Sequence, residues 1–248
     1  MQGGIFISWS TIQYKQKSNG VSWIILNRPE ARNAMSALMF DELNQLLLQL
    51  GKDVSTRSIL LTGEGKAFCA GGDLTEMKAG YGGNAGFYRH MENANQCIAT
   101  LLEIDKPVVA AVNGAATGAG MNLALAADIA IAAENAKFSE IFGNVGLIPD
   151  LGGTWLLPRL VGRAKAKELL FSYRMIGADV YYTTQENEFS SNLGNYVEDY
   201  TALVHVLYRL NGAGYHCLKY IKRNYRKVRA LLDQKYETFQ ELQDGLAR

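Results

Sequence analysis

Runs of consecutive apolar residues, separated by helix-like segments, constrain the fold of this chain most. Three such runs lie in the segments Arg57–Thr62, Pro107–Val112 and Ile129–Ala133. Ahead of the first run, apolar residues recur at helical spacing from Ser36 to Leu50, with Ser36 as the predicted N-cap. A strand that is apolar throughout must be covered on both faces, as in a parallel sheet flanked by helices. The sequence therefore predicts an α/β fold.

A hairpin is expected before this region and a helical part after it. Thr11–Gln16 and Val21–Leu26 are rich in β-forming residues and flank the turn signal Ser18-Asn19-Gly20. Towards the C-terminus the pattern becomes helical and richer in tyrosine and basic residues. We therefore predict a core domain at residues 1–165 and a helical C-terminal region at residues 166–248.

One internal segment lacks a clear pattern. Thr75–Gly86 is rich in glycine, and a helix is expected after it at Phe87–Ile104. Such a segment is typical of a mobile loop. Tyr81 and the glycines around it are compatible with a lid over a bound ligand and equally with a disordered loop.

Composition and charge exclude several classes of protein. The chain has 248 residues and a net charge of +1, so no global charge points to a nucleic-acid partner or an acidic membrane surface. Polar residues and glycines interrupt the most apolar stretch, Pro107–Ala133, and we predict no membrane span. The three cysteines lack CxxC spacing and the three histidines are scattered, which argues against disulfides and a metal site. We expect a cytoplasmic protein without a metal.

Two segments place small residues between a strand and a helix. The first is Lys66-Ala67-Phe68-Cys69-Ala70-Gly71-Gly72-Asp73-Leu74, and the second is Asn113-Gly114-Ala115-Ala116-Thr117-Gly118-Ala119-Gly120-Met121-Asn122-Leu123. Glycines at such a turn let backbone N–H groups point into a cleft, where they can stabilise a developing oxyanion. Each turn alone is also explained by tight packing. Two of them together fit the two-amide oxyanion hole of acyl-transfer and enolate enzymes.

A third segment carries one carboxylate among apolar residues and glycines. It is Gly146-Leu147-Ile148-Pro149-Asp150-Leu151-Gly152-Gly153-Thr154-Trp155. If Asp150 is enclosed, burial raises its pKa and makes it a usable base. Alternatively, Asp150 caps the helix that begins near Gly152 or Thr154, which is a common role for Asp.

The three segments, in this order and at these separations, resemble the crotonase (enoyl-CoA hydratase/isomerase) superfamily. The resemblance runs from about Thr11 to Met175 and includes the motif Leu26-Asn27-Arg28-Pro29-Glu30-Ala31-Arg32-Asn33-Ala34. Gly118–Leu125 and Ile148–Arg159 are most similar to the branch of 1,2-epoxyphenylacetyl-CoA isomerases and Δ3,Δ2-enoyl-CoA isomerases. The implied fold is a spiral of ββα units with a helical C-terminal region that mediates oligomerisation.

The resemblance also implies roles for single residues. The backbone N–H groups of Gly72 and Ala119 would bind the thioester oxygen, and Asp150 would be the acid/base. In the family, the adenine and pantetheine of coenzyme A are held at the positions that match Ala31, Ala70 and Leu74, which are therefore the predicted coenzyme-binding residues. No permanently bound cofactor is implied, because coenzyme A enters as part of the acyl-CoA substrate.

One departure from the family's pattern indicates the type of reaction. Hydratases of the superfamily use two glutamates to activate water, and their positions match Asn122 and Phe142 here. Neither side chain can take a proton as a carboxylate does, although Asn122 stays among the predicted catalytic residues. Moving a double bond needs a single base, and Asp150 suits that task. The sequence therefore favours a CoA-thioester isomerase, with a phenylacetate or fatty-acid pathway implied by resemblance alone.

Two alternatives remain open, and one assembly is expected. The chain could be a hydratase or lyase that uses another base. It could also be a non-catalytic CoA- or RNA-binding homologue, since Lys219–Arg229 carries interleaved basic residues and tyrosines, although a solvated helix face explains these better. The family's usual assembly implies a homotrimer or a dimer of trimers.

Cys69, beside the first turn, is either a packing residue or, with an activating base, a nucleophile.

Overall fold

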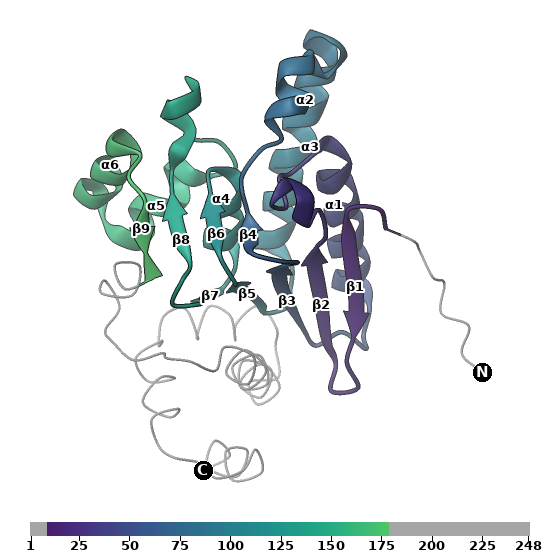
Figure 1. The fold of residues 1–248 in the computed structure, drawn as a ribbon. Helices are drawn as coiled ribbons and strands as arrows, with labels where there is room; N and C mark the ends of the chain where they lie inside the picture. Colours follow the sequence, from purple (N-terminus) through teal and green to yellow (C-terminus); the bar gives the residue numbers. More distant parts are fainter. Residues whose placement is uncertain (1–8, 179–248) are drawn as a thin grey trace, which may run out of the picture.

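The computed structural model of this chain describes residues 9–178, which form two sheets with helices around them (Figure 1). The five-stranded sheet has the order β1-β2-β3-β5-β7 and the four-stranded sheet has the order β4-β6-β8-β9. The strands of the first sheet are β1 (Ile12–Gln16), β2 (Val21–Leu26), β3 (Ser58–Gly63), β5 (Val108–Val112) and β7 (Ile129–Ala132). Those of the second are β4 (Ala67–Cys69), β6 (Ala115–Thr117), β8 (Lys137–Ser139) and β9 (Ile176–Gly177).

The five-stranded sheet confirms the predicted hairpin and the predicted parallel core. β1 pairs with β2 in antiparallel fashion, while β2, β3, β5 and β7 run parallel to one another. The consecutive residues Ile59, Leu60 and Leu61 of β3 are all buried. Because neighbouring strand residues point to opposite faces, both faces of this strand are covered.

Three of the four strands of the second sheet directly follow strands of the first. β4 follows β3, β6 follows β5 and β8 follows β7, and a helix comes after each pair. These helices are α2 (Leu74–Ala79), α4 (Ala119–Ala126) and the 3-10 helix η3 (Ile141–Val145). Three successive strand–strand–helix units result, which confirms the predicted spiral of ββα units.

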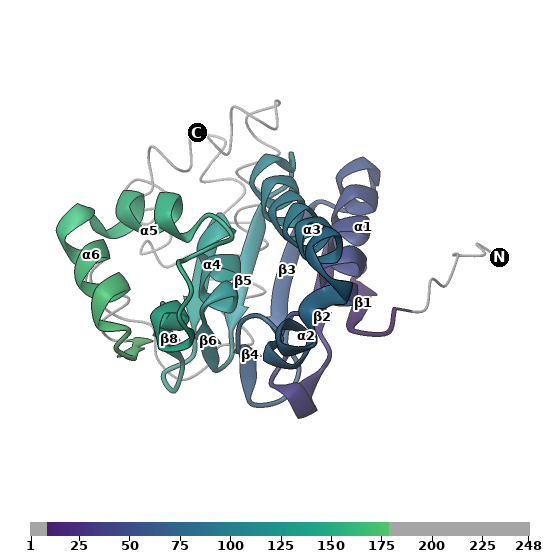
Figure 2. The same cartoon turned by 90° about the horizontal axis from the view of Figure 1, so that it is seen from above.

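The main core lies between the five-stranded sheet and two long helices. α1 (Ala37–Lys52) and α3 (Asn84–Glu103) lie side by side on one face of that sheet (Figure 2). Leu43 and Leu47 of α1 and Cys97 of α3 are fully buried there. A smaller cluster, which includes Leu60 and Val109, buries the opposite face. The apolar residues that recur at helical spacing in the 36–50 segment thus form the face of α1 that packs on the sheet.

The prediction of a mobile loop at 75–86 is wrong in its secondary structure. Residues 74–79 form α2, Gly80–Gly82 forms the 3-10 helix η2, and α3 begins three residues earlier than expected. The Asp73 side chain accepts hydrogen bonds from the N–H groups of Thr75 and Glu76 and so caps α2. The second small-residue turn also differs from expectation, because residues 115–117 within it form the strand β6.

The predicted domain division falls inside a helix. α6 (Arg163–Ser172) crosses the boundary between residues 165 and 166, and its Ala166 and Leu169 belong to the main core. β9 then joins the second sheet beside β8. The remainder of the predicted C-terminal region, including the basic segment 219–229, lies outside the described residues, so its oligomerising role stays a prediction.

The cap of α1 allows a first test of the local structure. Ser36 accepts a hydrogen bond from the Met39 N–H at 3.1 Å and is buried. Replacing Ser36 by Ala is expected to lower the free energy of unfolding by about 1 kcal/mol, because one buried N–H loses its acceptor. Denaturant unfolding curves measure the change, and Ser36→Thr, which keeps the hydroxyl, is the matched control. Equal stability of Ser36→Ala and the parent chain would contradict the assigned cap.

Candidate active site

The carboxyl ends of three neighbouring parallel strands form the site. β6 pairs in parallel with β4 on one side and with β8 on the other. Parallel strands end at the same edge of a sheet, so the residues that follow them gather there. Gly72 follows β4, Ala119 follows β6 and Glu140 follows β8. The two small-residue turns predicted to act together are therefore neighbours in space.

Within residues 9–178, the backbone N–H groups of both predicted oxyanion donors have no backbone acceptor. Gly72 forms an isolated parallel bridge with Met35, whose hydrogen bonds use the Gly71 oxygen and the Asp73 N–H and so leave out the Gly72 N–H. Ala119 is the first residue of α4, and the first N–H groups of a helix have no acceptor within it. A helix N-terminus also favours nearby negative charge.

Close backbone contact fixes the distance between the two turns. A Cβ atom added to Gly71 would lie 2.8 Å from the Thr117 carbonyl oxygen and 3.6 Å from the Ala119 nitrogen. A Cβ atom added to Gly120 would lie 2.2 Å from the Cys69 oxygen. Glycine is required at both positions because only a residue without a side chain allows this approach. The glycines of the two motifs therefore bring the two N–H donors together.

Asp150 does not cap the helix that follows it. α5 (Gly153–Val161) begins after Gly152, and no side chain caps its N-terminus. Asp150 Oδ1 is buried and accepts no hydrogen bond from the residues the structure describes. Burial raises the Asp150 pKa to about 6, against a smaller opposing effect of its own backbone N–H. Of the two interpretations left open by the sequence, the enclosed carboxylate is the one that the geometry supports.

Asn122 connects α4 to the Asp150 loop. Its side chain is fully buried, and its Nδ2 donates a hydrogen bond of 2.9 Å to the Asp150 backbone oxygen. The Gly153 N–H donates to the same oxygen at 2.9 Å. A Cβ atom on Gly153 would lie 2.4 Å from Asn122 Nδ2, so the loop is closely packed on this amide. Asn122 thus contacts the backbone of Asp150, where it helps to hold the loop.

Glu140 is a second carboxylate at this site, and it was not among the residues predicted from the sequence. Glu140 follows β8, is 1 % exposed, and neither carboxylate oxygen accepts a hydrogen bond from residues 9–178. Burial, then the charge of Asp150, raises its pKa to about 7, while the adjacent Asn122 amide has a smaller lowering effect. Its one sequence signal is a charged residue directly after a short strand and before the apolar Ile141 and Phe142.

The structure brings the segments of two predicted coenzyme-binding residues, Ala31 and Ala70, into contact. Ala31 ends the 3-10 helix η1 (Pro29–Ala31), and the Ala70 N–H donates to the Arg32 oxygen at 3.0 Å. Ala31 and Ala70 are partly buried, and Leu74 is 48 % exposed at the start of α2. Binding of coenzyme A at these positions stays a prediction.

A buried ion pair holds the 28–34 segment against this turn. Arg28 donates to Asp73 Oδ2 at 2.8 Å and also to the Ala34 oxygen at 2.6 Å. Burial acts to raise the Asp73 pKa, but the Arg28 hydrogen bond and the capped N–H groups outweigh it and lower the pKa. The ionised carboxylate therefore serves both the α2 cap and the loop.

Aromatic side chains from α1, η2 and α3 form a small cluster. Tyr81 stacks on His90 with ring centroids 4.2 Å apart, and Phe40 meets the same imidazole edge-on at 5.6 Å. Burial raises the Tyr81 pKa to about 12, with smaller contributions from Glu76, Asp73 and Asp150. The charges of Asp73, beside the first turn, and of Asp150 thus reach the Tyr81 hydroxyl.

Other candidate chemistry is not supported in the described part of the chain. Burial raises the Cys69 pKa to about 12, so this thiol stays neutral and packs in the core. Residues 9–178 contain no group of three or more metal-ligating side chains. None of the helices in this range is both long and apolar enough to cross a bilayer.

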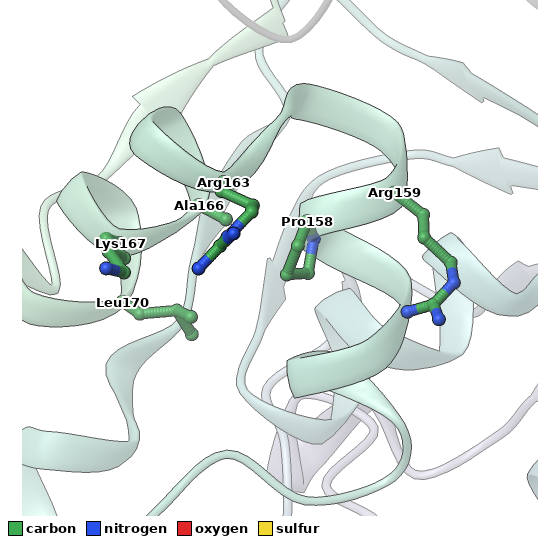
Figure 3. A pocket seen from close by; sticks show the side chains of 6 residues that line it. All are labelled: Pro158, Arg159, Arg163, Ala166, Lys167 and Leu170. Carbon is green, nitrogen blue, oxygen red and sulfur yellow. The ribbon is translucent and has the colours of Figure 1, made fainter.

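A separate basic groove of about 460 Å³ lies between α5 and α6 (Figure 3). Its lining comprises Pro158, Arg159, Arg163, Ala166, Lys167 and Leu170. The Arg159 guanidinium also lies 4.0 Å from the centroid of the Trp155 ring. The groove shares no lining residue with the strand-end site, so the predicted chemistry does not involve it.

The family model for enoyl-CoA hydratases and isomerases matches residues 16–181 of this chain. The chain belongs to this family. The 1,2-epoxyphenylacetyl-CoA isomerase of Escherichia coli K12 is 44 % identical over 168 residues, which cover 64 % of this chain and 62 % of that protein. A probable enoyl-CoA hydratase of Rhodobacter capsulatus is 44 % identical over 176 residues, covering 70 % of this chain and 65 % of that protein.

Solved structures give the same family and fold. An enoyl-CoA hydratase from Bacillus anthracis superposes with a TM-score of 0.72 at 30 % identity, covering 88 % of this chain and 90 % of that one. The match to the two sequence relatives spans less than two thirds of their length. The predicted crotonase membership and fold are confirmed.

The raised pKa values of this crotonase site predict how its stability depends on pH. The ordinary values are 3.8 for Asp150 and 4.5 for Glu140, and the folded values are about 6 and about 7. The folded state therefore binds more protons from about pH 4 to about pH 7, and its free energy of unfolding falls as the pH rises through this window. The difference in unfolding free energy between Glu140→Gln and the parent chain should therefore be more favourable to the variant at pH 8 than at pH 4, by on the order of 2 kcal/mol.

Denaturant unfolding at both ends of that pH range measures this gain. Glu134→Gln, at an exposed position, is the matched control and should show the same stability offset from the parent chain at both pH values. A pH-independent offset for Glu140→Gln would contradict the raised pKa.

Proposed function

We propose that this crotonase isomerises an acyl-CoA thioester through an enolate. Asp150 would take a proton from the carbon next to the thioester carbonyl, and the Gly72 and Ala119 N–H groups would hold the resulting oxyanion. The neutral Asp150 would then return the proton two carbons further along the acyl chain. The double bond moves into conjugation with the carbonyl, and no atom is gained or lost.

The Asp150 carboxylate, whose Oδ1 is buried without a donor among residues 9–178, is the observation that carries this proposal. It does not serve a structural cap, and its pKa of about 6 leaves it mostly ionised near neutral pH. A base with such a pKa can both remove a proton and give it back at a similar free energy. Two free N–H donors at neighbouring strand ends supply the electrostatic stabilisation that an enolate needs.

The acyl group is proposed from the relatives and from the aromatic lining. A 3-enoyl-CoA is the simplest substrate for one base. A ring epoxide of phenylacetyl-CoA is a second candidate, because a relative that is 44 % identical is an isomerase of that thioester. The stacked Tyr81 and His90 rings offer an aromatic surface of the kind that a ring-bearing acyl group would contact.

Hydration is the second candidate function, and Glu140 is the observation that favours it. The sequence offered no second proton-handling group, but the structure places a buried carboxylate beside Asp150. Two carboxyl groups at one site are what a hydratase needs to activate water and deliver a proton. One relative, from Rhodobacter capsulatus, bears the name of a probable enoyl-CoA hydratase.

A single experiment separates the two functions. The purified full chain is incubated with a 3-enoyl-CoA, and in parallel with a 2-enoyl-CoA, in water enriched in both deuterium and heavy oxygen. Isomerisation gives the conjugated thioester with deuterium exchange and no heavy oxygen. Hydration gives a 3-hydroxyacyl thioester that carries heavy oxygen. A folded protein that binds coenzyme A but yields neither product nor exchange would overturn both proposals.

A further inference from the structure

The end of β8 adds a third functional position to the strand-end site. Ser139, the last residue of β8, accepts a hydrogen bond from the Gly118 N–H at 2.8 Å, which ties this strand end to the start of α4. The next residue, Glu140, is thereby held at the same sheet edge as the two N–H donors. Its placement follows from the repeat of strand, turn and helix and not from any motif.

Four buried oxygens near this point lack a hydrogen-bond donor among residues 9–178. They are both carboxylate oxygens of Glu140, Oδ1 of Asp150 and Oδ1 of Asn122. Two ionised carboxylates without donors would be very costly in a buried site. A proton on one of them removes a charge and creates an O–H donor at the same time. The cluster therefore requires one neutral carboxylic acid.

We propose that Glu140 is this proton-holding member of the pair and a positioning residue for Asp150. With Glu140 neutral, Asp150 remains as the single ionised carboxylate and can act as the base. This inference rests on the proposed enolate function for its catalytic part, but not for the protonation state itself. It also differs from the two-glutamate arrangement of hydratases, whose positions here are Asn122 and Phe142.

The environment of the two carboxyls explains why the proton sits on Glu140. Glu140 is 1 % exposed, whereas the Asp150 residue is only partly buried and faces Tyr81. Within the described residues, the groups acting on Glu140 are the Asp150 charge, from the loop before α5, and the Asn122 amide, from α4. No basic side chain in that range offsets the burial. The more enclosed carboxyl is the harder one to ionise.

Ionisation of Glu140 at higher pH would oppose the reaction. A second negative charge at the site repels the enolate that the N–H donors stabilise. The pair then titrates in two steps, the first giving the active form with ionised Asp150 and the second giving a doubly ionised form. The pH profile of kcat/KM in the parent chain should fall on its alkaline side, by up to about tenfold per pH unit.

The first test does not depend on catalysis. Infrared difference spectra of the full chain near neutral pH detect the C=O stretch of a neutral carboxylic acid. This band should disappear in Glu140→Gln. It should remain in Asp150→Asn but titrate at a lower pH, because the Asp150 charge no longer raises the Glu140 pKa, and Glu134→Gln is the exposed control that leaves it unchanged. If Glu140→Gln removes only the signal of an ionised carboxylate, the proposal is overturned whether or not the chain is an isomerase.

The second test compares the pH profiles of kcat/KM for the parent chain and Glu140→Gln. The variant side chain is always neutral, so its profile should keep the acid limb due to Asp150 and lose the alkaline limb. A profile that superimposes on the parent's would overturn the positioning role, because a merely structural Glu140 would leave the profile's shape unaltered. Deuterium exchange of the substrate's α proton gives the same comparison if a later step limits turnover.

Discussion

Replacement of Asp150 by Asn is expected to lower kcat/KM for thioester isomerisation by about 100- to 10,000-fold. The amide has nearly the same shape but cannot take a proton. Because the Asp150 backbone oxygen, not its carboxylate, accepts the Asn122 and Gly153 hydrogen bonds, the loop geometry should survive the change. Steady-state kinetics, with conjugated thioester followed by ultraviolet absorbance, measure the loss.

Binding and folding controls separate chemistry from damage. Asp150→Asn should bind an unreactive CoA thioester as the parent chain does, since the predicted coenzyme-binding residues lie at the first turn. The unfolding free energy of Asp150→Asn, relative to that of the parent chain, should also rise from acid to alkaline pH. The reason is that the parent chain loses stability when its Asp150 carboxyl, which has a raised pKa, ionises. Normal turnover by Asp150→Asn would exclude this residue as the base.

Much of the fold could be predicted from the sequence because the apolar pattern of each strand indicates which of its faces are buried. Three consecutive apolar residues such as Ile59, Leu60 and Leu61 fit a strand covered on both faces, and the structure has them there. The turn at 18–20 likewise specifies a hairpin through local chemistry. Helix α2 was missed because its glycine-rich surroundings outweigh a short helical pattern, and its cap, Asp73, looked like part of the oxyanion turn.

The parts of the site that are built from glycine turns could be predicted from the sequence. The parts that depend on where a residue lies in the folded chain could not. Two small-residue turns carry a local signal, and the parallel pairing of β4 and β6 places them together. The role of Asp150 could not be decided locally, because both a cap and an enclosed base fit the same residues. Glu140 has almost no local signal. It becomes visible once β8 is known to run beside β6, so that its end reaches the same edge.

This dependence on topology makes the close contact between the two turns the most sensitive feature of the site. Gly120 has an ordinary helical backbone, yet an added Cβ would lie 2.2 Å from the Cys69 oxygen and 2.7 Å from the Cys69 Cβ. Both are far below any contact that real Cβ atoms make, and the nearest partner is backbone, which cannot turn aside. A methyl group at 120 must therefore push the end of β4 away from the start of α4.

Replacement of Gly120 by Ala is expected to cost about 3 kcal/mol of unfolding free energy. In protein that remains folded, the Gly72 and Ala119 donors are displaced from each other, and the loss of one oxyanion donor lowers kcat by about 100- to 1,000-fold. Denaturant unfolding and isomerisation kinetics measure the two effects separately.

The matched control is Gly51→Ala, also a glycine within a helix. A Cβ at 51 would meet nothing closer than Ile104 Cγ1 at 3.6 Å, an ordinary contact. This variant should be as stable as the parent or up to about 1 kcal/mol more stable, because alanine is the better helix former, and its activity should be unchanged. If both alanine variants behave alike, the packing of α4 against β4 does not position the two N–H donors. If Gly120→Ala alone loses stability and turnover, the two glycine-rich motifs are joined by backbone contact into one catalytic unit.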